Sequence, residues 1–229
     1  MLEGVHLVDI YCSRIGAPET LVVLDEALAR ADVADLVARV PPSRTIVVSR
    51  TLFAELATLP ADVATLAVVP TPTPADTSPG HFCLLLEDVQ DPGNVGTMIR
   101  TAAAAGADQV VLSPHCAFAW APRPLRAGQG AHFLTAVIEG VDLRQWVTAF
   151  RHAGGRTFAT VVAGAMPLYS ADLRGRVAIV VGSEGSGVTH ALLDVVDGRI
   201  TIPMAAGSES LNAAAAAAVL LFEAVRQRR

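Results

Sequence analysis

Hydrophobic positions along the chain fall into two regions in which strand-like and helix-like segments alternate. In the first region, short runs rich in β-branched residues predict strands at 20–24 and 45–48, and a helical period predicts helices at 26–39 and 51–59. In the second region, the predicted strands are 82–86, 109–112, 157–162, 177–181 and 199–202, and the predicted helices are 95–105, 143–153, 188–196 and 211–227. Continuous Val, Ile and Leu strands interleaved with helices indicate an α/β fold with a parallel sheet covered on both faces.

A proline-rich segment separates the two regions. Residues 70–80 contain four prolines and end in a glycine, a composition that breaks both helix and strand periodicity. The sequence therefore predicts a small α/β domain at 1–70, a linker at 71–80 and a larger α/β domain at 81–229. Because ligands bind parallel α/β sheets at the carboxyl ends of the strands, we expect the site in loops that follow strands of the larger domain.

The composition narrows the class of protein. Of 229 residues, 52% are hydrophobic, which is enough to fill a core, while the longest apolar runs reach about half of the ~20 residues that a membrane-spanning helix needs. Cys12, Cys83 and Cys116 lie far apart, which fits a reducing compartment and not a disulfide framework. His115 beside Cys116 is not spaced as a metal site. With no export signal at the N-terminus, we expect a soluble cytoplasmic protein with no membrane segment and no metal.

All 17 basic residues are arginine, and this absence of lysine excludes two kinds of chemistry. Walker-A phosphate loops and Schiff-base enzymes, including those that use pyridoxal phosphate, require a lysine. The net charge of -5 is unfavourable for binding a polyanion by the whole surface. Residues 1–80 carry 5 arginines against 10 acidic residues, whereas residues 81–229 carry 12 of each. Any nucleic-acid-binding surface must therefore be local.

Three loops that follow strands of the larger domain carry the candidate chemistry. The first loop begins at Glu87 and leads into a helix. Asn94 is suited to cap the N-terminus of this helix, and Gly106 is suited to end it. Arg100 points off the apolar face of this helix. Taken alone, this stretch also fits a plain cap and a solvated surface charge.

The second loop, at 181–187, is a glycine-rich turn between an apolar strand and a helix. Such a turn lets backbone N–H groups approach a ligand closely. It matches neither the G-x-G-x-x-G dinucleotide pattern nor the G-x-S-x-G nucleophile elbow. Glu184 inside the turn would repel a pyrophosphate. The loop therefore favours a neutral or cationic ligand, or a glutamate that orients an arginine, although a purely structural turn also fits.

The third loop, at 202–212, contains an Ile-Pro-Met turn and a glycine, followed by Ser210 and Asn212 ahead of six alanines. Ser210 could cap the final helix, and the alanines could permit close packing. A cap accounts for only one of the polar groups that gather at this junction, beside the glycine-rich loop. The junction is therefore a further candidate ligand site.

Together, the three loops resemble the motifs of the SpoU (TrmH-like) ribose 2′-O-methyltransferases of the SPOUT class. The family's motifs are an Asn followed six positions later by an Arg, then G-x-E-G-x-G, then I-P-M with a nearby S-L-N. Here they correspond to Asn94 with Arg100, to 182–187 and to 202–212, in the same order and context. The resemblance covers residues 81–229, and residues 1–70 look more loosely like the family's small RNA-binding domain.

The resemblance implies a SPOUT domain whose parallel sheet ends in a C-terminal trefoil knot, an exception to the usual unknotted rule. It implies S-adenosylmethionine as cofactor and a homodimer with its active sites at the subunit interface. By position, the residues expected to hold the cofactor are Thr160, Gly182, Ile202, Met204 and Leu211. The residues expected to carry catalysis are Asn94, Arg100, Glu184, Ser210 and Asn212.

The resemblance also implies roles for these residues in methyl transfer to a ribose hydroxyl. An arginine, with a pKa above ~12, is a poor proton acceptor, so we expect Arg100 to clamp a phosphate and the developing oxyanion. Glu184 would orient Asn94 or Arg100. Ser210 would contact the phosphate or Arg100, and Asn212 would help to fix the cofactor loop.

Arg123 and Arg126 lie in a segment, 121–132, that is predicted to be a loop and resembles the family's R-[AS]-[ST]-x-G element. Gly128 stands in place of the hydroxyl residue of that element. We expect both arginines to bind RNA phosphates, because a homodimer would supply two such loops and offset the acidic overall charge. Two solvated arginines are the alternative.

The sequence therefore predicts an S-adenosylmethionine-dependent enzyme that methylates a ribose 2′-hydroxyl of RNA. A separate substrate domain favours ribosomal RNA over transfer RNA by analogy of fold. The alternatives are a tRNA 2′-O-methyltransferase and a catalytically silent protein that binds RNA or the cofactor. An NAD-dependent dehydrogenase that uses loop 182–187 is disfavoured, because the next strand ends at 200–203 without an acidic residue.

Overall fold

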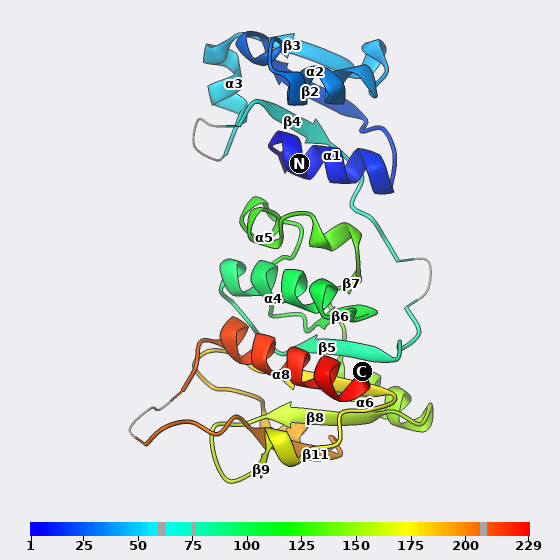
Figure 1. The fold of residues 1–229 in the computed structure, drawn as a ribbon, viewed down its shortest axis with the longest axis vertical. Coiled ribbons are helices and arrows are strands. Elements are labelled where there is room, and N and C mark those ends of the chain that lie inside the picture. The colour runs from blue at the N-terminus through cyan, green and yellow to red at the C-terminus, as the bar shows by residue number, and fades with distance from the viewer. Residues whose placement is uncertain (59–62, 75–76, 207–209) are drawn as a thin grey trace.

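The computed structural model describes residues 1–58, 63–74, 77–206 and 210–229, and it contains two β-sheets (Figure 1). The first sheet has four strands in the order β1-β4-β2-β3. The N-terminal elements are β1 (Leu2–Glu3), α1 (Val5–Arg14), β2 (Thr20–Leu24), the 3₁₀ turn η1 (Asp25–Ala27), α2 (Ala31–Ala38), the 3₁₀ turn η2 (Pro42–Arg44), β3 (Thr45–Val48), α3 (Arg50–Leu56) and β4 (Thr65–Val68). Strands β2 and β3 are parallel, whereas β4 runs antiparallel to β1 and β2.

The helix predicted at 26–39 is wrong as a single element, because the structure divides it into η1 and α2. Ala27 on η1 and Leu36 on α2 are both buried in the N-terminal core. These two residues are nine positions apart, and in one continuous helix their side chains would lie on roughly opposite faces. The break at Arg30, whose backbone is extended, lets both side chains reach the same core.

The second sheet has seven strands in the order β7-β6-β5-β10-β8-β11-β9, and every neighbouring pair is parallel, as the sequence predicted. Its elements are β5 (Phe82–Leu86), α4 (Pro92–Ala104), β6 (Gln109–Leu112), α5 (Pro122–Gly128), η3 (Ala131–Phe133), β7 (Ala136–Ile138), α6 (Leu143–His152), β8 (Arg156–Thr160), β9 (Met166–Pro167), η4 (Leu168–Ser170), β10 (Val177–Val181), α7 (His190–Leu193), β11 (Gly198–Thr201) and α8 (Ala213–Arg228).

The central strands of this sheet are buried on both faces. Leu84 and Leu86 belong to a core with residues of α4 and α8, whereas Cys83 and Leu85 belong to a second core with residues of α6 and α7. Side chains of a strand alternate between faces, so both sets must be apolar. This double burial explains why the strands form unbroken hydrophobic runs in the sequence.

Two predicted elements of this region are corrected by the structure. The segment predicted as a loop at 121–132 contains helix α5, with Pro122 in its first turn, where a missing N–H costs nothing. The helix predicted at 188–196 is the short α7, which begins after its N-cap Thr189.

Helix α5 lies between the N-terminal elements and α4 (Figure 1). On the α4 side, Gly96 permits close packing, since a Cβ there would lie 2.3 Å from the carbonyl oxygen of Pro124. On the other side, Leu125 is buried in the N-terminal core. The rings of Tyr11 and Phe133 meet edge to face at 5.4 Å. The two regions are therefore joined through α5 and η3.

Candidate active site

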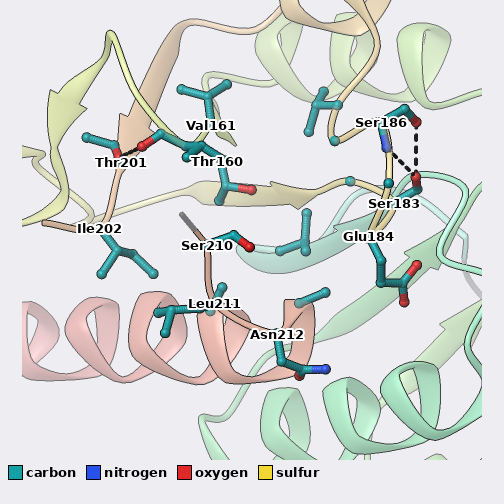
Figure 2. Close-up of a pocket in the computed structure, with 18 of the residues that line it drawn as sticks. Thr160, Val161, Ser183, Glu184, Ser186, Thr201, Ile202, Ser210, Leu211 and Asn212 are labelled. Carbon is teal, nitrogen blue, oxygen red and sulfur yellow. Dashed lines mark hydrogen bonds between the residues drawn. The ribbon is translucent and has the colours of Figure 1, made fainter. Parts of the chain in front are cut away.

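The carboxyl ends of β8, β10 and β11 lead into loops that surround one cavity of about 540 Å³. In Figure 2 the glycine-rich loop, with Ser183 and Glu184, lies opposite Thr160 and Ile202. The cavity lining includes every residue expected to hold the cofactor, namely Thr160, Gly182, Ile202, Met204 and Leu211. It also includes three residues expected to act in catalysis, namely Glu184, Ser210 and Asn212.

The glycine-rich loop forms a closed turn at one wall of the cavity. Ser183 and Gly187 exchange two backbone hydrogen bonds, of 3.2 and 3.0 Å. A Cβ at Gly182 would lie 2.2 Å from the carbonyl carbon of Gly187 and 2.3 Å from the nitrogen of Val188. Since these are backbone atoms that cannot move aside, the closed turn requires glycine at this position.

A chain of hydrogen bonds joins the three loops at the cavity edge. The Asn94 Nδ2 donates to Glu184 Oε1 at 2.8 Å, and the Asn212 Nδ2 donates to Asn94 Oδ1 at 3.0 Å. The Asn212 Oδ1 in turn accepts from the backbone nitrogens of Ala214 and Ala215, at the start of α8. An ionised carboxylate can only accept, so Glu184 fixes which way the amide of Asn94 faces.

The expected N-cap of α4 is corrected by the structure. Asp91 is the cap, and its carboxylate accepts from the backbone nitrogen of Asn94 at 2.7 Å. Asp91 thus satisfies a backbone donor at the helix end, and the side chain of Asn94 is free to bind Glu184 and Asn212. At the final helix, Asn212 rather than Ser210 is the cap.

Three arginines singled out from the sequence lie outside the cavity. Arg100 is exposed on α4, and Arg123 and Arg126 are exposed on α5. None of their guanidinium groups forms an ion pair within the described ranges. Within the same ranges, eight other arginines do pair with carboxylates, namely Arg30, Arg39, Arg50, Arg151, Arg156, Arg174, Arg199 and Arg226.

The positions of these three arginines are related through the packing of α4 on α5. Arg100 follows Gly96 by four residues, and residues four apart share one face of a helix. Gly96 is the point at which α4 touches α5, so Arg100 lies on the side of α4 that faces α5. The three arginines therefore occupy neighbouring helices.

The electrostatics of the cavity select among ligands. Among the described lining residues, Glu184 is the one with an ionisable side chain, and apolar contacts come from Ile202, Met204 and Leu211. A cavity that is mostly apolar with a few polar groups is typical of small-molecule sites. A lone carboxylate favours a cationic or neutral organic ligand and disfavours a pyrophosphate.

The cysteines take no part in the cavity. Burial raises the pKa of Cys83 to about 12, and burial also raises the pKa of Cys116. Both thiols therefore stay protonated and unreactive at neutral pH. Among the described residues, no cluster of three or more His, Cys, Asp or Glu side chains could hold a metal ion. In the same residues, no helix is both long and apolar enough to span a membrane.

Sequence reasoning missed one contact beneath the glycine-rich loop. The Thr189 backbone nitrogen donates to Glu87 Oε2 at 2.8 Å, and its Oγ1 donates to Glu87 Oε1 at 2.7 Å. Glu87 directly follows the fully apolar strand β5. An acidic residue at the end of a buried strand indicates a polar partner nearby, but that partner, Thr189, lies 102 positions away in the sequence.

The parallel sheet and the cavity at the carboxyl ends of its strands define an α/β protein built to bind an organic ligand at that edge. Residues 81–222 match the model of the SpoU rRNA Methylase family. The chain therefore belongs to that family.

The similarity to one relative extends well beyond residues 81–222. The 23S rRNA (guanosine(2553)-2′-O)-methyltransferase RlmP of Bacillus subtilis is 33% identical over 224 residues, covering 97% of this chain and 86% of that protein. The 23S rRNA (guanosine-2′-O-)-methyltransferase RlmB of Xanthomonas campestris is 37% identical over 145 residues, covering 63% of this chain and 58% of that protein.

Solved structures show the same fold. The SpoU methyltransferase AviRb from Streptomyces viridochromogenes superposes with a TM-score of 0.87 at 28% identity, covering 99% of this chain and 88% of that one. The structure of AviRb in complex with the cofactor AdoMet gives a TM-score of 0.85, covering 98% of this chain and 88% of that one.

Proposed function

We propose that this protein transfers a methyl group from S-adenosylmethionine to a ribose 2′-hydroxyl of RNA, with ribosomal RNA as the substrate. The observation that carries the proposal is the hydrogen-bonded chain Asn212–Asn94–Glu184 at the edge of the cavity. It joins the three loops whose motifs resemble those of the SpoU methyltransferases. Membership of the SpoU rRNA methylase family supports it independently.

The cavity suits S-adenosylmethionine, which supplies an electrophilic methyl group on a positively charged sulfur. Glu184 is a favourable neighbour for a cation, whereas it would repel a pyrophosphate. Backbone groups of Gly182, Ile202 and Leu211 would hold the cofactor, and Met204 would line the adenine pocket. Thr160, at the end of β8, adds a polar contact from the opposite wall.

The chain's own residues would position the ribose hydroxyl and stabilise the charge that develops on its oxygen. The bound cofactor would supply the methyl group and leave as a neutral thioether, and the hydroxyl proton would pass to water. Arg100 would bind the adjoining phosphate and the developing oxyanion rather than accept that proton. Glu184 orients Asn94, Ser210 contacts the phosphate or Arg100, and Asn212 holds the third loop against the first.

We further propose a homodimer with its active sites at the subunit interface. Arg100 does not line the cavity of its own chain, so a second copy that contributes the α4–α5 edge would complete the site. The same proposal includes the trefoil knot at the C-terminal end of the sheet. It also assigns residues 1–70 to substrate binding, 71–80 to a linker and 81–229 to catalysis, in a cytoplasmic enzyme.

The RNA would bind along α4 and α5, where Arg100, Arg123 and Arg126 are exposed and without ion pairs among the described residues. Arginines already paired with carboxylates have less to offer a phosphate. Ribosomal RNA is favoured over transfer RNA because the similarity to RlmP spans 97% of this chain, including the N-terminal region.

The replacement Arg100→Ala tests the proposed role of this residue. We expect the affinity for S-adenosylmethionine, measured by calorimetry, to stay unchanged, because Arg100 lies outside the cavity. We expect methylation of ribosomal RNA to fall by about 10²- to 10³-fold, the usual cost of losing one oxyanion donor. The matched control is Arg144→Ala, an exposed arginine on α6, which covers the other face of the sheet. Normal turnover in Arg100→Ala would remove this residue from the mechanism.

A further inference from the structure

Glu87 and Thr189 connect the first loop of the site to the far end of the glycine-rich loop. We infer that Glu87 is a positioning residue for the cofactor and acts by holding the end of the glycine-rich loop through Thr189. This inference rests on the proposed function, because it takes S-adenosylmethionine as the ligand of the cavity.

The backbone of Glu87 fixes the start of the glycine-rich loop. The Glu87 nitrogen donates to the carbonyl oxygen of Val181 at 2.9 Å, which continues the parallel pairing of β5 and β10 by one residue. The side chain of Glu87 then leaves the sheet edge toward Thr189. One residue thus contacts the chain directly before Gly182 and directly after Val188.

The side chain of Glu87 fixes the end of the loop. Each of its two oxygens accepts one hydrogen bond from Thr189, at 2.7 Å from the hydroxyl and 2.8 Å from the backbone nitrogen. Glu87 is 9% exposed and forms no ion pair within the described residues. Hydrogen bonds to an ionised carboxylate are stronger than those between neutral groups. Loss of the carboxylate would leave two donors of Thr189 without their acceptor.

Among the described residues, the rest of the loop has few other attachments besides Val188, which is buried in the core with residues of α6 and α7. Its interior is closed by the Ser183–Gly187 backbone pair, and its tip touches another loop through Glu184 and Asn94. Thr189 is also the N-cap of α7, where its Oγ1 accepts from the Leu192 nitrogen. The contact with Glu87 therefore sets the position of the turn relative to β5. That position in turn determines where the backbone groups that line the cavity lie.

A purely stabilising role predicts a different outcome from a positioning role. If Glu87 only stabilised the fold, its replacement would lower the melting temperature and leave the affinity of the folded protein for S-adenosylmethionine unchanged. If Glu87 positions the loop, the replacement raises the Kd and the KM for S-adenosylmethionine and leaves the KM for RNA unchanged.

The experiment compares four single variants of the full chain by calorimetric titration with S-adenosylmethionine and by steady-state methylation of ribosomal RNA. We expect Glu87→Ala to weaken cofactor binding by about tenfold to a hundredfold. Glu87→Gln and Thr189→Val each keep part of the contact and should weaken binding less. Thr189→Ser keeps both donors and should restore an affinity close to that of the wild type.

Two further variants sharpen the result. Glu87→Ala combined with Thr189→Val should bind no more weakly than Glu87→Ala alone, because Glu87→Ala already removes the whole contact. The matched control is Glu139→Gln, a partly buried glutamate that accepts from the Ala119 nitrogen at 2.7 Å and does not line the cavity. It should leave the affinity for S-adenosylmethionine unchanged.

The outcomes separate this inference from the proposed function. If the wild type fails to bind S-adenosylmethionine, the proposed function is wrong and the inference falls with it. If the wild type binds and folded Glu87→Ala binds equally well, the inference alone is overturned. If Glu87→Ala does not fold, Thr189→Val and Thr189→Ser decide, and equal affinity in those two variants overturns the inference.

Discussion

The N-terminal region differs from helices α4 and α5 of the C-terminal region in how its arginines are paired. In the N-terminal region, Arg30, Arg39 and Arg50 are each paired with a carboxylate on an exposed surface. In the C-terminal region, arginines on α4 and α5 have no such partner among the described residues. We therefore expect the pairing of individual charges, more than the net charge of -5, to decide where a polyanion binds.

The same comparison explains how an acidic N-terminal region can serve an RNA-dependent activity. Its core includes Leu125 from α5, the helix that carries Arg123 and Arg126. The ring of Tyr11 packs against Phe133, which follows that helix closely. The N-terminal region can therefore hold the arginine-bearing helix in place without contributing positive charge of its own.

The largest effect is expected from Gly182→Ala, which acts on the C-terminal region alone. The new Cβ would meet backbone atoms of Gly187 and Val188, so the closed turn cannot persist. We expect calorimetry to detect no binding of S-adenosylmethionine, while the four-stranded sheet stays folded. Gly185→Ala is the matched control, because a Cβ there meets nothing within 4 Å. Wild-type affinity in Gly182→Ala would show that the cofactor does not depend on this loop.

The next effect concerns the junction between the two regions and depends on pH. Burial lowers the pKa of His132 from 6.5 to about 4, even though its Nε2 lies 2.9 Å from the carbonyl oxygen of Ala119. Between pH 6.5 and about 4, His132 is therefore protonated in the unfolded chain but not in the folded protein. Stability present above pH 6.5 is therefore lost as the pH falls toward 4, by about 2–3 kcal/mol.

Urea unfolding at pH 7 and at pH 4.5 measures this loss. His132→Gln keeps a donor for the Ala119 carbonyl but cannot titrate, so its stability should change by about 2 kcal/mol less between the two pH values. An equal change in wild type and variant would mean that His132 is not the group responsible.

A smaller effect is expected from Arg123 and Arg126 on α5. With Arg123 and Arg126 both replaced by alanine, RNA affinity should fall, and the slope of log K against log salt should decrease by about 1.5, because two phosphate contacts are lost. Replacing Arg30 and Arg50, which are already paired, should leave the slope unchanged. Equal slopes for both double variants would remove the distinction between the two regions. Filter binding over a range of salt concentrations measures the slopes.

Much of the C-terminal fold could be predicted, for a physical reason. Strands 82–86, 109–112 and 177–181 have the predicted bounds because each is buried on both faces and must be apolar throughout. The three motif loops were also found correctly at the strand ends, since polar groups and glycines interrupt the apolar pattern there.

Other features depend on contacts that a local pattern cannot carry. The sequence predicts a loop where α5 lies, and the prolines and glycine of this helix are typical of a turn, although proline is compatible with a first helical turn. Asp91, rather than Asn94, caps α4, because the amide of Asn94 binds Glu184 and Asn212. These partners lie 90 and 118 positions further along the chain. The bond between Glu87 and Thr189 is equally distant in sequence, and no local period indicates it.

The most direct test of the central claim is to incubate the protein with 23S ribosomal RNA and S-adenosylmethionine carrying a labelled methyl group, and then to digest the RNA with alkali. Alkali needs a free 2′-hydroxyl to cleave the chain. Our account predicts that the label remains in alkali-resistant dinucleotides, and that Asn94→Ala loses this signal. Label released in mononucleotides, as from a methylated base, or no transfer at all from the wild type would contradict the account.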